Sequence, residues 1–196
     1  MSLTVPLTGV RLRISFWFFA AIALFLMLER QIFLWYIALP VLIHELGHLA
    51  AIILCRAKVA EIHLTLASAR IVTRSVTLPY HSELAIAMGG IAANLLLALY
   101  LRFFEFQSLR TMLMIASNLA VAAFNMLPIG NLDGGRIVYL LCARYLHPRT
   151  AHTISTLVSA IVLVPLTALA ALLLLRGGNF TLVLLCAYLV IIVARK

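Results

Sequence analysis

The chain has 196 residues, of which 65% are hydrophobic and 11% are charged, whereas about 25% of the residues in soluble domains are charged. This composition excludes an ordinary soluble domain and predicts an integral membrane protein. The net charge of +9 does not indicate nucleic-acid binding, because Lys and Arg lie at the ends of apolar segments and not on a polar surface with aromatic residues. We expect a single membrane-embedded domain over residues 1–196, with no separate soluble domain.

About six apolar segments are candidates for transmembrane helices, because a helix needs about 20 apolar residues to cross the bilayer. In chain order they cover residues 14–28, 32–55, 84–101, 111–146, 150–175 and 180–193, and the first and last are short. No small-residue cleavage site follows the first segment, which favours a helix over a signal peptide. The sequence therefore predicts an all-α polytopic membrane protein.

Residues 59–78, between the second and third segments, have a different pattern. Ile62, Leu64 and Leu66 alternate with polar residues, which is the period of a β-strand, and a second β-rich run covers residues 71–78. We predict a small β-hairpin near the cytoplasmic surface. It is either an ordinary connection or an edge that pairs with an extended peptide.

The fourth apolar segment is interrupted by the stretch NMLPIGNLDGGR, residues 125–136. Pro128 and the glycines at 130, 134 and 135 break a helix there. Broken helices at membrane depth occur only where they line a cavity or are buried in protein. We therefore expect a broken fourth helix inside the protein.

The basic residues predict the orientation of the chain. An even number of membrane spans places both termini on one side, and most Lys and Arg fall in the loops of that side. The positive-inside rule then makes both termini cytoplasmic. The three cysteines lie in or beside apolar segments, so they indicate neither a disulfide framework nor a cysteine metal site.

The second apolar segment carries the sequence HELGH, residues 44–48. On a helix, His44 and His48 project from one side, one turn apart, and can hold one metal ion, with Glu45 placed to take a proton from a water molecule. Ionisable side chains inside a membrane are costly and by default mark function. A bound Zn²⁺ would compensate for their burial, because imidazole nitrogen and carboxylate oxygen are good zinc ligands.

A catalytic zinc ion usually has three protein ligands and one open position. The other acidic residues lie at segment ends or in loops, and only Asp133 lies inside a membrane segment. Asp133 is therefore the candidate third ligand by elimination. The alternative is a capping or turn role, since two glycines follow it.

Other polar residues in the membrane segments have two interpretations each. Gly89, Gly90 and Asn94 either allow close helix packing with one interhelical hydrogen bond or support the site. Asn118 and Asn125 are seven residues apart and share a helical face. They form either a hydrogen-bonded helix interface or a polar channel for substrate.

The motifs HELGH, GGIAAN and FNMLPIGNLDGGR, in this order, resemble those of the site-2 protease family of intramembrane zinc metalloproteases, over a catalytic core of about 32–146. The resemblance is greatest to the six-span branch that processes a sigma-factor precursor during sporulation. It implies that His44, His48 and Asp133 bind one Zn²⁺ and that Glu45 activates water. It also implies supporting or substrate-binding roles for four residues: Gly90, Asn94, Asn125 and Pro128. Related sequences commonly have proline where this chain has Asn131.

The sequence thus predicts a zinc metalloendopeptidase that cleaves a regulatory substrate within or near the membrane. The resemblance implies a membrane-associated substrate, such as a sigma-factor precursor or an anti-sigma factor, an inhibitory membrane partner, and a bacterial cytoplasmic or forespore-surrounding membrane. The alternatives are a catalytically idle zinc-binding scaffold and a metal transporter. A structural zinc usually has four protein ligands, and a transport path needs polar or acidic residues on both sides of the site.

Overall fold

A computed structural model of the chain describes residues 2–7, 10–15, 31–57, 59–64, 69–73, 78–105, 108–130, 132–177 and 180–194. The chain forms two compact units, Met1–Ala122 and Ala123–Lys196. The boundary between them falls within helix α4 (Leu109–Met126).

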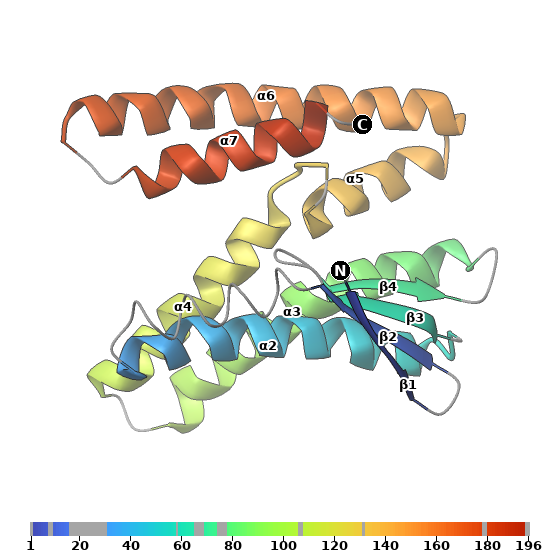
Figure 1. Ribbon diagram of the computed structural model, residues 1–196, viewed down its shortest axis with the longest axis horizontal. Coiled ribbons are helices and arrows are strands. Elements are labelled where there is room, and N and C mark those ends of the chain that lie inside the picture. The colour runs from blue at the N-terminus through green and yellow to red at the C-terminus, as the bar shows by residue number, and fades with distance from the viewer. Residues whose placement is uncertain are drawn as a thin grey trace. The chain divides into compact units, whose positions relative to one another are not determined.

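The first unit contains a four-stranded sheet in the order β1-β2-β3-β4 (Figure 1). Its strands are β1 (Ser2–Leu7), β2 (Val10–Ser15), β3 (Val59–Leu64) and β4 (Ala69–Thr73). Strands β1 and β2 pair antiparallel, as do β3 and β4, whereas β2 and β3 pair in parallel. The segment in which a hairpin was expected therefore contributes half of a larger sheet.

This sheet is larger than the single small hairpin predicted for an otherwise all-α chain. Residues 10–15, VRLRIS, alternate apolar and basic residues, the strand period, although the basic residues were assigned to the flank of a membrane helix. Residues 14 and 15 of the first predicted membrane segment belong to β2. The remainder of that segment, 16–28, lies outside the described residues.

Helices α2 (Gln31–Leu54) and α3 (Tyr80–Phe104) pack closely in the first unit. Their backbones touch at two glycines: a Cβ added to Gly47 would collide with the Gly89 carbonyl oxygen, and one added to Gly89 would lie 2.6 Å from the Gly47 carbonyl oxygen. Small residues allow such close approach of membrane helices. The contact holds the HELGH turn of α2 directly against α3.

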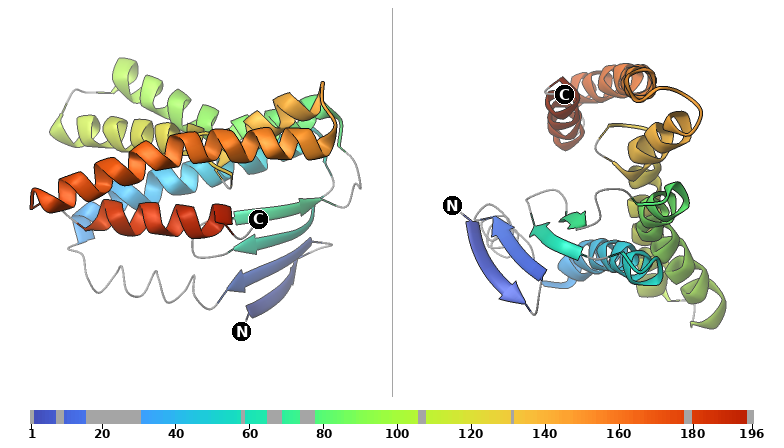
Figure 2. Two further views of the ribbon diagram at one scale, coloured as in Figure 1. Left: turned by 90° about the horizontal axis from the view of Figure 1, so that it is seen from above. Right: turned by 90° about the vertical axis from the view of Figure 1, so that its right-hand side faces the viewer.

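The second unit contains α5 (Asp133–Ala143), α6 (Pro148–Leu175) and α7 (Thr181–Ala194). Helices α6 and α7 lie side by side (Figure 2). Its buried core joins Ile129, from the loop before α5, to Leu163 of α6 and Leu189 of α7. The loop is therefore anchored by the same apolar contacts that hold the two helices together.

The predicted break in the fourth segment is confirmed. Helix α4 ends at Met126 and α5 begins at Asp133, so the interruption covers the residues that contain Pro128 and Gly130.

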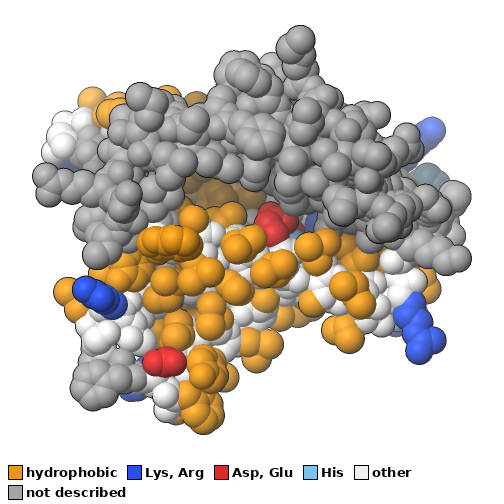
Figure 3. All heavy atoms as spheres, turned by 60° about the horizontal axis from the view of Figure 1, so that its bottom comes forward, with side chains coloured by type: hydrophobic (Ala, Val, Ile, Leu, Met, Phe, Trp, Pro, Cys, Tyr) orange, Lys and Arg blue, Asp and Glu red, His pale blue; other side chains and the backbone are white. Residues whose placement is uncertain are grey.

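Among the described residues, four helical stretches are long and apolar enough to cross a membrane: Trp35–Leu54, Tyr80–Phe104, Leu109–Met126 and Pro148–Leu175. A shorter apolar stretch, Leu182–Ile191, lies in α7. Four of the about six predicted spans are thus present as long apolar helices in the described part of the chain. Hydrophobic side chains dominate the visible described face in Figure 3, and large ones such as Ile53, Phe103 and Ile161 are exposed. Such a surface suits an integral membrane protein, because lipid takes the place of water around it.

Candidate metal centre

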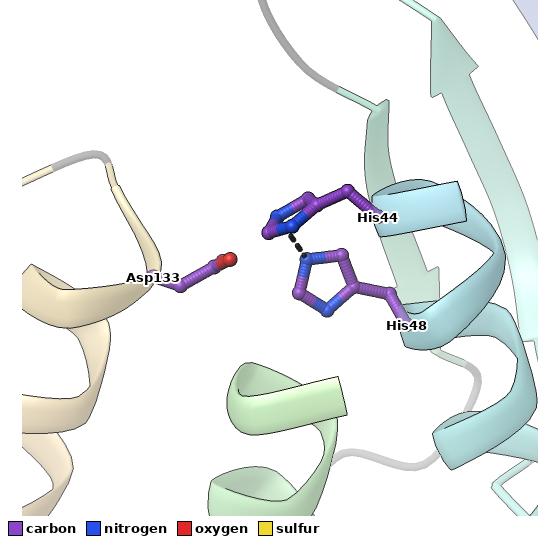
Figure 4. Close-up of side chains that lie close together, drawn as sticks. All are labelled: His44, His48 and Asp133. Atoms are coloured by element: carbon purple, nitrogen blue, oxygen red, sulfur yellow. Dashed lines mark hydrogen bonds between the residues drawn. The ribbon is translucent and has the colours of Figure 1, made fainter. Parts of the chain in front are cut away.

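His44 and His48 meet on one side of α2, as their spacing predicts. Their rings lie nearly perpendicular, with centroids 4.8 Å apart and an interplanar angle of 89°. The two Nε2 atoms are 3.2 Å apart (Figure 4). His44 is buried, with 4% of its surface exposed, and His48 is half-buried.

The proton of His44 is fixed by Asn94 of α3. The His44 Nδ1 atom lies 2.8 Å from Asn94 Oδ1. The amide nitrogen of Asn94 donates to the Pro40 carbonyl oxygen and to Asn118 Oδ1, at 2.9 Å each, so its oxygen is the atom that faces His44. An amide oxygen only accepts hydrogen bonds. In the neutral ring, Nδ1 of His44 therefore carries the proton and Nε2 carries a lone pair.

The proton of His48 is fixed in the same way by backbone. Its Nδ1 atom lies 2.7 Å from the Ile86 carbonyl oxygen, which can only accept. In the neutral ring Nδ1 again carries the proton, so Nε2 of His48 also presents a lone pair. Metal-binding histidines typically donate their other ring N–H to a carbonyl or carboxylate in this manner.

Two Nε2 lone pairs thus converge at 3.2 Å, which is unfavourable unless a proton or a cation lies beside them. Two nitrogen ligands at about 2.0–2.1 Å from a tetrahedral zinc ion are about 3.3 Å apart. The distance between the two ring nitrogens and their tautomers therefore both fit a zinc site.

Gly90 of α3 leaves room beside these nitrogens. A Cβ at this position would lie 2.6 Å from His48 Nε2 and 2.7 Å from His44 Nε2. Any larger residue would occupy the space in front of both lone pairs. Gly90 and Asn94 therefore contact the histidines directly, whereas their functional roles remain predictions.

The two acidic residues of the predicted site lie in different units. Glu45 follows His44 on α2 and is half-buried. Asp133, also drawn in Figure 4, is the half-buried first residue of α5. The N-cap residue of α5 is Leu132, whose backbone is extended at φ −83° and ψ 163°. Asp133 is therefore not the N-cap residue, which was one of its alternative roles. Its assignment as third ligand remains a prediction.

The loop that precedes Asp133 is held by a buried serine of α6 that the sequence analysis did not identify. The Gly130 N–H donates to Ser159 Oγ at 3.0 Å, and this hydroxyl lies 3.1 Å from the Pro128 carbonyl oxygen and 2.7 Å from that of Ser155. Ser159 is fully buried. The only sequence signal was a pair of serines one helical turn apart in an apolar segment.

Asn118 is also fully buried and hydrogen-bonded to Asn94. This contact between α3 and α4 confirms the hydrogen-bonded helix interface, one of the two roles predicted for Asn118. The Pro128 carbonyl oxygen accepts a hydrogen bond from Ser159, and Asn125 is half-buried on α4. The roles of Pro128 and Asn125 remain predictions, and Asn131 lies outside the described residues.

Comparisons with known proteins find a family match over part of the chain and a similar fold. A family model described as Peptidase family M50 matches residues 105–166, a range that includes Asp133. The fold is similar to that of a solved structure, the site-2 protease from Methanocaldococcus jannaschii, with a TM-score of 0.64 and 20% sequence identity. The similarity covers 100% of this chain and 95% of that one. A search of curated proteins gave no match.

Proposed function

We propose that this chain is an intramembrane zinc metalloprotease with His44 and His48 as two ligands and Asp133 as the third. The observation that carries the proposal is the convergence of two Nε2 lone pairs at 3.2 Å, each fixed by a hydrogen bond at Nδ1. The peptidase match and the similarity of fold support it independently.

In this proposal the chain binds one zinc ion through His44 Nε2, His48 Nε2 and an Asp133 carboxylate oxygen. When bound, zinc lowers the pKa of a water molecule towards about 7 and polarises a peptide carbonyl. Glu45 accepts the proton of the attacking water and returns it to the leaving amine. Pro128, Asn125 and the residues around them support substrate or ligand binding.

The proposed substrate is a membrane-associated regulator, such as a sigma-factor precursor or an anti-sigma factor, and an inhibitory membrane partner restrains the enzyme. A helical substrate must unwind locally before its carbonyl groups can react. Strand β4 ends the sheet on one side, and its outer edge is a place where the unwound peptide would pair. Photo-cross-linkers placed at β4 positions test this step. If none of them cross-linked to the substrate peptide, the result would count against it.

Both termini are proposed to be cytoplasmic, in a bacterial cytoplasmic or forespore-surrounding membrane. The pairing of β2 with β3 supports this, because it joins the N-terminal residues to the segment after α2, and the basic residues near both were assigned to the cytoplasmic side.

The test is co-expression with a membrane-tethered sigma-factor precursor, comparing wild type with Glu45→Gln and measuring zinc in both purified proteins. Loss of cleavage with retention of zinc in Glu45→Gln would support the protease. Equal cleavage by both proteins would remove Glu45 from the mechanism. An inactive wild type that still holds zinc would favour the idle scaffold, and zinc uptake into vesicles would favour the transporter.

A further inference from the structure

We propose that Asn118 is a positioning residue for the metal centre: it holds the Asn94 amide in the orientation that keeps the His44 Nε2 lone pair available to zinc. The inference rests on the proposed zinc site and extends it to a third helix, α4. Asn118 would act on His44 through Asn94.

The orientation of the Asn94 side chain decides which nitrogen of His44 can bind metal. The two ends of an amide have nearly the same shape, but one accepts hydrogen bonds and the other donates them. If Asn94 were turned over, its N–H groups would face His44 Nδ1, which would then have to accept. The His44 proton would move to Nε2 and remove the lone pair that a metal needs.

Two acceptors hold Asn94 in the observed orientation. One is the Pro40 carbonyl oxygen of α2, and the other is Asn118 Oδ1, both at 2.9 Å from Asn94 Nδ2. In the reversed orientation the Asn94 oxygen would face two other oxygens. Removing either acceptor lowers the cost of that reversal.

Asn118 is itself fixed in orientation. Its Nδ2 atom donates at 2.9 Å to the carbonyl oxygen of Met114, one turn earlier on α4, so its Oδ1 atom is directed at Asn94. Asn94 and Asn118 are both 0% exposed. An unsatisfied amide is costly when it is buried in this way. The donor and acceptor directions are therefore fixed from Asn118 of α4 through Asn94 of α3 to His44 of α2.

A simpler role for Asn118 would be to hold α3 and α4 together, since interhelical hydrogen bonds stabilise helix packing in membranes. The two roles make different predictions. If Asn118 only holds the helices together, its replacement lowers the thermal stability and has no specific effect on zinc affinity. A positioning residue affects zinc affinity, and only while Asn94 is present.

The experiment measures zinc affinity of the purified full-length protein by competition with a chromophoric chelator, together with thermal unfolding in the absence of zinc. The variants are Asn118→Leu, Asn118→Asp, Asn94→Ala and the double variant Asn94→Ala with Asn118→Leu. Ser117→Ala, which removes a hydroxyl from the neighbouring residue, is the matched control. Asn118→Ala replaces Asn118→Leu if the latter does not yield folded protein.

We expect Asn118→Leu to bind zinc about tenfold more weakly, in the range found for residues that orient metal ligands. Asn118→Asp should retain affinity, because a protonated carboxyl group offers the same acceptor to Asn94 and a donor to Met114. In the Asn94→Ala background, Asn118→Leu should have no further effect on affinity.

Unchanged affinity in Asn118→Leu, or an equal loss with and without Asn94, would overturn the inference. A wild type that binds no zinc would overturn both the inference and the proposed function. A wild type that binds zinc but cleaves no substrate would contradict only the protease, and the affinity measurements would still decide the role of Asn118.

Discussion

Replacing Gly90 with alanine gives the sharpest prediction of this structure. The new Cβ would lie 2.6 Å from His48 Nε2 and 2.7 Å from His44 Nε2, whereas ordinary contact begins at 3.4 Å. The two ring nitrogens would have to retreat by about 0.8 Å and about 0.7 Å, while metal–ligand distances tolerate deviations of only about 0.2 Å. We therefore expect zinc affinity to fall at least about 100-fold, which corresponds to about 2.8 kcal/mol.

The change should not unfold the protein through the backbone, because Ala is favoured over Gly inside a helix by about 0.5–1 kcal/mol. Zinc affinity is measured by chelator competition, and folding by thermal unfolding of the zinc-free protein. Ala92→Ser is the matched control, since Ala92 is exposed on the same helix and also gains one heavy atom. If Gly90→Ala bound zinc as tightly as wild type, the position of the two Nε2 atoms against α3 would be refuted.

Two further predictions concern stability. Ser159→Ala removes the hydroxyl that holds the loop before α5 and should lower the free energy of unfolding by about 1–3 kcal/mol, measured by chemical unfolding in detergent; a loss no larger than that of the exposed Thr156→Ala would contradict it. Gly47→Ala should separate α2 from α3 at Gly89 and cost about 1–3 kcal/mol. Unfolding temperatures equal to those of the exposed Ala50→Ser would show that these backbones do not touch.

The parts of the fold that could be predicted from sequence are those with strong local signals. The break between α4 and α5 followed from proline and glycine in an apolar segment, because neither residue continues a helix easily. The side-by-side arrangement of His44 and His48 followed from helix geometry. Beyond the segment of the expected hairpin, the sheet did not follow from sequence. The pairing of β2 with β3 joins segments far apart in the chain, and such pairing leaves no local pattern beyond strand alternation.

The hydrogen bonds around the histidines were also beyond sequence analysis. Asn118 had two equally acceptable interpretations, since its face on α4 was known but the residue opposite it was not. Of the two glycines at which α2 and α3 touch, the sequence indicated a packing role only for Gly89 of α3 and not for Gly47 of α2. Ser159 gave little signal, because a serine in an apolar helix often bonds only to its own backbone.

X-ray absorption at the zinc K edge, recorded on the purified wild-type protein, tests the central claim most directly. The account predicts one zinc ion with two imidazole nitrogens at about 2.0–2.1 Å and oxygen in the remaining positions. A protein without zinc, or zinc without imidazole ligands, would contradict it.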